Sequence, residues 1–213
     1  MGKFISFEGG EGSGKSTQVK LLADAMTSQG LDVLLTREPG GAAGAEEIRK
    51  LLVEGEPERW DAVTETLLHF AARRDHMETT VAPALAAGRI VITDRFADST
   101  TAYQGYGHGV DLDFIRDLYK STVGNRGPDL TLILDIPVDE GLARAGKRAE
   151  DAGSDEDRYE RMDTKFHHRL RDGFQDIAKL DPERCVVVTT AGSVEEIHHR
   201  IRQAVSIRLG IDL

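Results

Sequence analysis

The sequence is poor in cysteine and in positive charge. Its single cysteine, Cys185, cannot form an internal disulfide and fits the reducing conditions of the cytoplasm. The chain carries 37 Asp and Glu against 27 Lys and Arg, a formal net charge of −10. Nonspecific binding to DNA or RNA depends on a basic surface that displaces counterions. We therefore expect a cytoplasmic protein with no nucleic-acid partner.

Long apolar runs are also absent. No run approaches the roughly 20 residues of a membrane-spanning helix, so we expect no membrane partner. The N-terminus lacks the basic region, apolar core and cleavage site of a secretion signal, which predicts no export. The chain of 213 residues has no internal repeat and is long enough for one substantial core. We expect a single domain, residues 1–213.

Short apolar runs are present instead. The first begins at Phe4, and four more follow at residues 33–36, 89–94, 130–136 and 185–190. Each is nearly continuous in aliphatic residues, the pattern of parallel strands buried on both faces. Segments of helical periodicity separate them, among them a long one at 63–85 that we expect to bend near Pro83. This alternation predicts an α/β fold with ligands beyond the carboxyl ends of the strands.

A glycine-rich stretch, GGEGSGKS at residues 9–16, follows the first apolar run. It matches the pattern G-x-x-x-x-G-K-[ST], in which backbone N–H groups and a helix start bind phosphate oxygens. In this pattern Lys15 reaches the β- and γ-phosphates, and the Ser16 hydroxyl can bind Mg²⁺. A glycine-rich turn can also merely join a strand to a helix. Because the match lies between a strand and an amphipathic helix, it predicts a nucleoside triphosphate site.

The segment TREPGG, at residues 36–41, follows the second apolar run. Its proline and glycines force a turn that holds Arg37 near the carboxyl edge of the sheet. Arg37 is either a substrate residue or part of a simple β–α turn. The Glu38–Pro39 bond is a candidate for the cis form, because ordered cis peptides occur before proline.

The segment DRFADSTTAYQG follows the third apolar run and begins at Asp94. An acid at a strand end can hold Mg²⁺, and Arg95 can clamp a phosphate with its two-pronged guanidinium. An ordinary ion pair between these two residues is the alternative. The hydroxyls and the amide of Ser99, Tyr103 and Gln104 are typical of a nucleoside pocket.

The segment LLHFAARRDH, at residues 67–76, belongs to the long helical stretch. Here His69 and Arg73 lie one helical turn apart. An aromatic ring together with an arginine could stack on a base and donate a hydrogen bond to its carbonyl edge. Phe70 could be that ring, but a phenylalanine at such a position is more often part of the core than a stacking surface.

A last segment, residues 144–161, is almost wholly polar and dense in charge of both signs. It fits a solvated loop between helices. It equally fits a mobile flap that brings arginines onto a phosphate.

Taken in order, these segments resemble those of the thymidylate kinase family, whose members phosphorylate dTMP with ATP. The resemblance covers nearly the whole chain, and the pairing of REPGG with DR…S…AYQG is far more specific than the phosphate loop. It implies a five-stranded parallel sheet flanked by helices on both faces, the P-loop nucleoside monophosphate kinase fold. It further implies a short mobile lid at about 144–161, a homodimer, and transfer of the γ-phosphoryl group of MgATP to dTMP.

The resemblance also implies roles for individual residues. The ATP site comprises Gly10, Glu11, Gly12, Ser13, Gly14, Lys15, Ser16, Thr17 and Arg144, with Mg²⁺ at Ser16 and Asp94. The dTMP site comprises Arg37, His69, Phe70, Arg73, Arg95, Ser99, Thr100, Tyr103 and Gln104. Lys15 and Arg95 act in catalysis, with Glu11 between donor and acceptor.

The position of a catalytic arginine divides the family. One subgroup carries it in the phosphate loop, whereas the other, typical of bacteria, carries it in the lid. The loop here has no arginine, so the resemblance points to the lid, where Arg144, Arg148 and Arg158 are the candidates. Of these, Arg148 and Arg158 are assigned to catalysis and Arg144 to ATP binding. Two residues depart from the family pattern: His69 stands where phenylalanine is usual, and His108 where many relatives have arginine. Either His69 or its neighbour Phe70 would stack on thymine.

Two alternative functions stay open. The chain could serve another pyrimidine nucleoside monophosphate, such as dUMP or dCMP, because a methyl group is a small recognition feature. It could also be a regulator that binds ATP without transferring phosphate, against which the intact Lys15, Asp94 and Arg95 argue.

Overall fold

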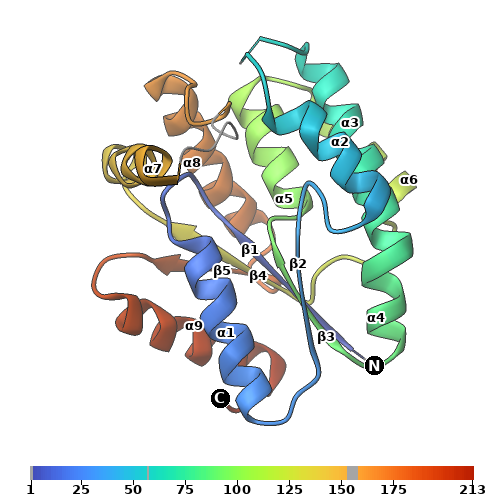
Figure 1. Ribbon diagram of the computed structural model, residues 1–213, viewed down its shortest axis with the longest axis vertical. Helices are drawn as coiled ribbons and strands as arrows, with labels where there is room; N and C mark the ends of the chain where they lie inside the picture. Colours follow the sequence, from blue (N-terminus) through green and yellow to red (C-terminus); the bar gives the residue numbers. More distant parts are fainter. Residues whose placement is uncertain (1, 57, 153–157) are drawn as a thin grey trace.

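Five parallel strands form the centre of the molecule (Figure 1). The computed structural model describes residues 2–56, 58–152 and 158–213. The strands are β1 (Lys3–Glu8), β2 (Val33–Arg37), β3 (Ile90–Asp94), β4 (Leu130–Asp135) and β5 (Cys185–Thr189), in the order β2-β3-β1-β4-β5. The prediction of a five-stranded parallel sheet in an α/β fold is therefore confirmed.

Helices cover both faces of this sheet (Figure 1). The longer ones are α1 (Lys15–Ser28), α2 (Ala43–Val53), α3 (Ala62–His76), α6 (Leu112–Thr122), α7 (Val138–Ala152), α8 (Thr164–Leu180) and α9 (Val194–Leu209). Short segments complete the set: η1 (Met77–Val81), α4 (Ala82–Ala86), α5 (Ala97–Thr100) and η2 (Thr101–Gly107). Helices α1 and α9 pack on one face, whereas η1, α4, η2 and α8 pack on the other.

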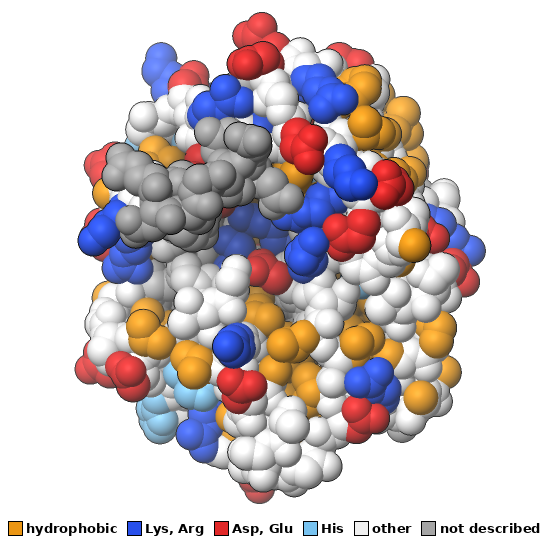
Figure 2. Space-filling view, in the orientation of Figure 1, with side chains coloured by type: hydrophobic (Ala, Val, Ile, Leu, Met, Phe, Trp, Pro, Cys, Tyr) orange, Lys and Arg blue, Asp and Glu red, His pale blue; other side chains and the backbone are white. Residues whose placement is uncertain are grey.

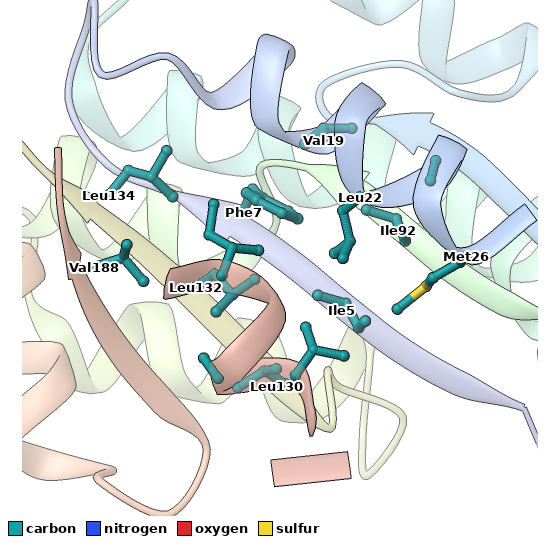
Figure 3. Close-up of a cluster of buried hydrophobic side chains, with 14 of the residues drawn as sticks. Ile5, Phe7, Val19, Leu22, Met26, Ile92, Leu130, Leu132, Leu134 and Val188 are labelled. Carbon is teal, nitrogen blue, oxygen red and sulfur yellow. The ribbon is translucent and has the colours of Figure 1, made fainter. Parts of the chain in front are cut away.

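The side chains of β1 alternate between two hydrophobic clusters. Ile5 and Phe7 point toward α1, where they meet Leu22 and Met26 (Figure 3). Phe4 points to the opposite face and packs with residues of η1 and α4. All of these side chains are buried, so both faces of the strand contribute to the core. This explains why the strand sequences are nearly continuous in apolar residues.

The long helix predicted at residues 63–85 is interrupted next to Pro83. Its first part is α3, its last part is α4, and the π-helical turn η1 lies between them. Pro83 has no N–H, and its ring would clash with the carbonyl four residues earlier in a regular helix. At this point Ala82 N–H donates to Met77 O, five residues back, so the hydrogen-bond pattern widens just before the proline.

The glycine-rich turn after β1 packs closely against neighbouring backbone. Gly9 has φ +131°, and a Cβ there would lie 2.4 Å from Leu134 O on β4. Gly12 has φ +66°, and a Cβ there would lie 2.0 Å from Gly141 O on α7. Both positions therefore require glycine even without a ligand.

Within the described residues, no helix has the length and apolar character needed to span a membrane.

Candidate active site

A cavity of about 520 Å³ opens beyond the carboxyl ends of the strands, beside the turn that follows β1. Figure 2 shows Lys and Arg side chains gathered around a hollow on this face. The predicted site residues that line the cavity are Glu11, Gly12, Ser13, Gly14, Lys15, Ser16, Thr17, Arg37, His69, Arg73, Asp94, Arg95, Ser99, Thr100, Tyr103 and Gln104. Segments far apart in the sequence thus meet at one place, as expected for an α/β sheet.

Lys15 lies at the start of α1 and is buried under the glycine-rich turn. Its ammonium donates to Gly9 O at 3.0 Å, Gly10 O at 2.8 Å and Ser13 Oγ at 3.2 Å. Burial, reinforced by the charge of Arg95, lowers the pKa of Lys15 to about 8. Gly10 does not line the cavity; it contributes its carbonyl to hold Lys15. A partly desolvated ammonium at a helix N-terminus is suited to bind phosphate.

Ser16 and Asp94 come together from α1 and the end of β3. Ser16 Oγ donates to Asp94 Oδ2 at 2.7 Å, and both residues line the cavity. A hydroxyl and a carboxylate oxygen are hard ligands of the kind that Mg²⁺ binds, and Mg²⁺ usually takes few protein ligands beside water and phosphate. This pair therefore fits the ion. Among the described residues, no group of three or more His, Cys, Asp or Glu side chains could hold a metal by itself.

Arg95 follows β3 in an unusual conformation, with φ +70°, the one positive φ at a non-glycine residue in the described parts of the chain. Its guanidinium donates to Gly9 O at 3.0 Å, Ser99 Oγ at 3.2 Å and Glu11 Oε1 at 2.9 Å. Tyr103 also donates its hydroxyl to Glu11 Oε1, and the guanidinium lies over the tyrosine ring. Arg95 is thus held in place beside the phosphate loop before any ligand binds.

Glu8, at the end of β1, holds the segment that follows Arg95. Its carboxylate accepts from Phe96 N–H at 2.8 Å and from Ser99 Oγ at 2.5 Å. Glu8 is completely buried, and burial together with the charge of Asp98 raises its pKa to about 7.

Arg73 enters the cavity from α3 and is 2% exposed. Glu38 accepts from Arg73 Nε at 2.7 Å, and Phe96 O and Thr100 Oγ1 accept from Arg73 Nη2 at 3.1 Å and 3.0 Å. The predicted cis bond before Pro39 is confirmed and follows Glu38 directly. Arg73 Nη1 has no hydrogen-bond partner although it is buried, so it is a donor available to a ligand.

Gln104 presents an unpaired hydrogen-bond acceptor to the same cavity. It lies on η2 and is 1% exposed. Its Nε2 donates to Glu65 Oε1 at 2.7 Å, whereas its Oε1 has no partner. The cavity wall therefore presents one unpaired donor, on Arg73, and one unpaired acceptor, on Gln104.

His69, rather than Phe70, lies at the cavity. Phe70 is buried beside Val110 and Ile115, and its ring lies 4.8 Å from the guanidinium carbon of Arg73. Of the two rings left open by the sequence, His69 is therefore the one that can reach a base, and Phe70 supports Arg73 from behind. Burial, followed by the charges of Arg73 and Arg158, lowers the pKa of His69 to about 3, so the ring is neutral near pH 7.

The comparisons agree with this geometry. The family model for thymidylate kinase matches residues 7–201. The chain belongs to the thymidylate kinase family. It is 50% identical over 210 residues to a thymidylate kinase of Caulobacter vibrioides, with 99% of each chain covered. It is 54% identical over 187 residues to that of Dinoroseobacter shibae, covering 88% of each. The crystal structure of thymidylate kinase from Ehrlichia chaffeensis aligns with a TM-score of 0.78 at 36% identity, covering 96% of this chain and 98% of that one.

In this thymidylate kinase family member, two of the lid arginines, Arg144 and Arg158, do not line the cavity. The predicted lid begins inside α7, where Arg144 is half-exposed and 3.8 Å from Glu140. The side chain of Arg148 lies outside the part of the chain that the structure describes. Arg158 is 1% exposed; it pairs with Glu65 and donates to the carbonyls of Leu52 and Glu56. Arg158 thus faces α3 and the end of α2 in this conformation, not the phosphate loop.

Arg37 lies at the cavity but is partly engaged on its outer side. Its guanidinium pairs with Glu46 at 3.0 Å, and both side chains are exposed. Glu46 also accepts from Gly41 N–H at 2.8 Å, so it ties the turn to α2. Because an exposed ion pair is weak, the contact with Glu46 does not prevent Arg37 from binding a ligand in the cavity.

Sequence reasoning missed Arg49, Tyr159 and the buried acid Glu65. Arg49 lines the cavity and donates to Pro39 O, and Tyr159 also lines it, its hydroxyl 3.0 Å from His69 Nε2. Glu38 lines the cavity beside Arg73, whereas Glu65 lies behind the cavity wall, against Gln104. The helical pattern does not mark Glu65 as buried, because the buried face of α3 also carries Thr66, Arg73 and His76.

Proposed function

We propose that this chain transfers the γ-phosphoryl group of MgATP to dTMP, giving dTDP and ADP. The observation that carries the proposal is the pair of unpaired atoms in the cavity wall, Arg73 Nη1 and Gln104 Oε1. A thymine ring has a carbonyl oxygen at position 4, which accepts, next to an N–H at position 3, which donates. Cytosine has the reverse pattern at both positions. The wall therefore matches thymine and uracil and mismatches cytosine.

The phosphate loop supports the donor side of this proposal. Backbone N–H groups of residues 10–17 and the ammonium of Lys15 would bind the ATP phosphates, with Lys15 exchanging its carbonyl partners for phosphate oxygens. Ser16 and Asp94 would hold Mg²⁺, which neutralises charge on the transferring phosphoryl group when bound.

Arg95 supports the acceptor side. Held by Gly9, Ser99 and Glu11, its guanidinium is positioned to bind the dTMP phosphate next to the loop, with Arg37 near it. In-line attack through a loose transition state needs positioning and positive charge more than proton transfer. No general base is required, because a phosphate monoester is already ionised near neutral pH.

The base would be enclosed by groups from three segments. Arg73 and Gln104 would read its polar edge, neutral His69 would face its ring, and Tyr103 would lie near the sugar. Thr100, which accepts from Arg73, would keep that guanidinium in its orientation. The 5-methyl group distinguishes dTMP from dUMP and is worth roughly 1–3 kcal/mol.

A panel of monophosphates in a coupled assay of ADP release tests the proposal. We expect Mg²⁺-dependent ADP formation to rise most with dTMP, less with dUMP, and least with dCMP. If dCMP were the best acceptor, the base assignment would be wrong. If no monophosphate raised ADP formation above the ATP-only rate, the chain would be an ATP-binding regulator instead.

We further propose that the protein acts as a homodimer in the cytoplasm. Val63 and Leu67 lie one turn apart on α3, and each is almost half exposed, which is unusual for two neighbouring apolar side chains on a helix. A second copy of the chain would cover them. Sedimentation of the wild-type protein should give the mass of two chains, and the double substitution Val63→Asp/Leu67→Asp should give the mass of one.

The buried, free thiol of Cys185 supports the cytoplasmic location, because it suits a reducing compartment.

A further inference from the structure

Glu65 stands directly behind the amide that would read the base. It lies on α3, is buried, and does not line the cavity. Its Oε1 accepts from Gln104 Nε2 at 2.7 Å, and its Oε2 accepts from Arg158. His108 also faces Oε1, with its Nε2 at 3.8 Å.

An ionised carboxylate can only accept hydrogen bonds, whereas an amide can present either its oxygen or its NH₂. Opposite Glu65, the amide of Gln104 has one favourable orientation, with NH₂ toward the carboxylate and oxygen toward the cavity. The reverse orientation would place two acceptor oxygens against each other and leave the NH₂ toward the cavity. The residue behind Gln104 thereby decides which atom a base meets.

Arg158 completes the arrangement. A carboxylate buried as deeply as that of Glu65 is costly unless a cation pairs with it. The Arg158 guanidinium is buried beside it and is itself held by the carbonyls of Leu52 and Glu56. Arg158 can only donate hydrogen bonds. The atom of residue 65 that it contacts, Oε2 in Glu65, must therefore be an acceptor.

We propose that Glu65 is a positioning residue that sets base selectivity: it orients Gln104 so that an acceptor faces the cavity, which selects pyrimidines with an N–H at position 3. This inference rests on the proposed dTMP kinase function. It assigns a role in substrate specificity to Glu65, whose side chain does not touch the substrate. Arg158 contributes to the same role by pairing with Glu65.

The substitution Glu65→Gln tests the mechanism with almost no change of shape. Arg158 requires the amide oxygen of the new side chain on its own side, so the new NH₂ faces Gln104. Gln104 must then turn its oxygen toward residue 65 and its NH₂ toward the cavity. We expect the ratio of kcat/KM for dTMP to that for dCMP to fall by roughly 10- to 100-fold, the effect of reversing a buried hydrogen bond.

Two comparisons separate this effect from a general disturbance. The ratio of dTMP to dUMP should stay within about twofold of wild type, because both bases carry the same N–H. In a Gln104→Leu background, adding Glu65→Gln should leave the dTMP to dCMP ratio unchanged, because no amide remains to be turned. Equal losses for dTMP, dUMP and dCMP in the single variant would overturn the proposal.

The exchanged double variant, Glu65→Gln/Gln104→Glu, provides the rescue. Its residue 104 accepts from the new amide and presents a second carboxylate oxygen to the cavity, so preference for dTMP over dCMP should return. A double variant that prefers dCMP would overturn the inference even if Glu65→Gln alone could not be purified in folded form. Wild-type activity on dTMP in the same assay tests the proposed function separately.

Discussion

Arg73 and Glu38 form an ion pair of 2.7 Å in which both side chains are almost completely buried. The pair joins α3 to the turn after β2. Glu38 also contacts His76 Nδ1 at 2.9 Å, so one carboxylate orients two side chains of the same helix. The donor that Arg73 offers to the cavity is therefore fixed by a residue of another segment.

Removing Glu38 should destabilise the fold strongly. Glu38→Ala leaves the Arg73 guanidinium buried without its anion, and breaking a buried pair in this way costs about 3–5 kcal/mol of unfolding free energy. Urea denaturation monitored by circular dichroism measures the loss. As a control, Glu47→Ala removes an exposed pair with Lys50 and should cost less than about 1 kcal/mol. Equal effects of the two substitutions would contradict the assignment of Glu38.

Binding of MgATP should take up a proton near pH 8. Because the pKa of Lys15 is about 8 without ligand, roughly half of the chains carry a neutral Lys15 at that pH, and phosphate charge would restore the proton. Calorimetry in buffers of different ionisation enthalpy should give an uptake of about half a proton at pH 8 and close to none at pH 7. Lys15→Arg, which stays charged, should abolish the uptake. Uptake that persists in this variant would point to another group.

Stability should depend on pH through Glu8. Its pKa is about 7 in the folded chain against 4.5 for an ordinary glutamate, so the native state binds more protons than the unfolded state between these values. The contribution of Glu8 to stability is therefore present below about pH 4.5 and is lost as pH rises through 7. Wild type should lose about 3 kcal/mol relative to Glu8→Gln between pH 4.5 and 8. If denaturant titrations gave parallel profiles of unfolding free energy against pH for wild type and Glu8→Gln, this prediction would be wrong.

The lid arginines should differ in what they affect. Arg148→Ala should lower kcat by about 10³-fold or more if its guanidinium neutralises the transition state, with little change in stability. Because Arg158 pairs with buried Glu65, Arg158→Ala should lower stability and the affinity for dTMP. Arg144 lies on an exposed helix face, so Arg144→Ala should weaken ATP binding only moderately. Single-turnover rates and thermal melts separate these effects. If neither Arg148→Ala nor Arg158→Ala lowered kcat, the lid would not supply the catalytic cation.

Patterns that are local in the chain determined much of this protein in advance. Continuous apolar runs separated by helical periodicity predict a parallel sheet, because a strand buried on both faces has no polar side. The run GGEGSGKS predicts the turn and the placement of Lys15, since both depend on consecutive residues. Segments that follow strands had to meet at one edge, so the cavity contains most of the predicted site.

Only the tertiary structure decided what stands behind the cavity wall. Whether His69 or Phe70 faces the cavity depends on how α3 packs against α6, and Phe70 lies in that interface. Glycine at positions 9 and 12 is required by β4 and α7, segments far along the chain. The pairing of Arg158 with Glu65 joins residues 93 positions apart. Such contacts follow from packing, because a sequence pattern specifies which face is buried but not which distant side chain meets it there.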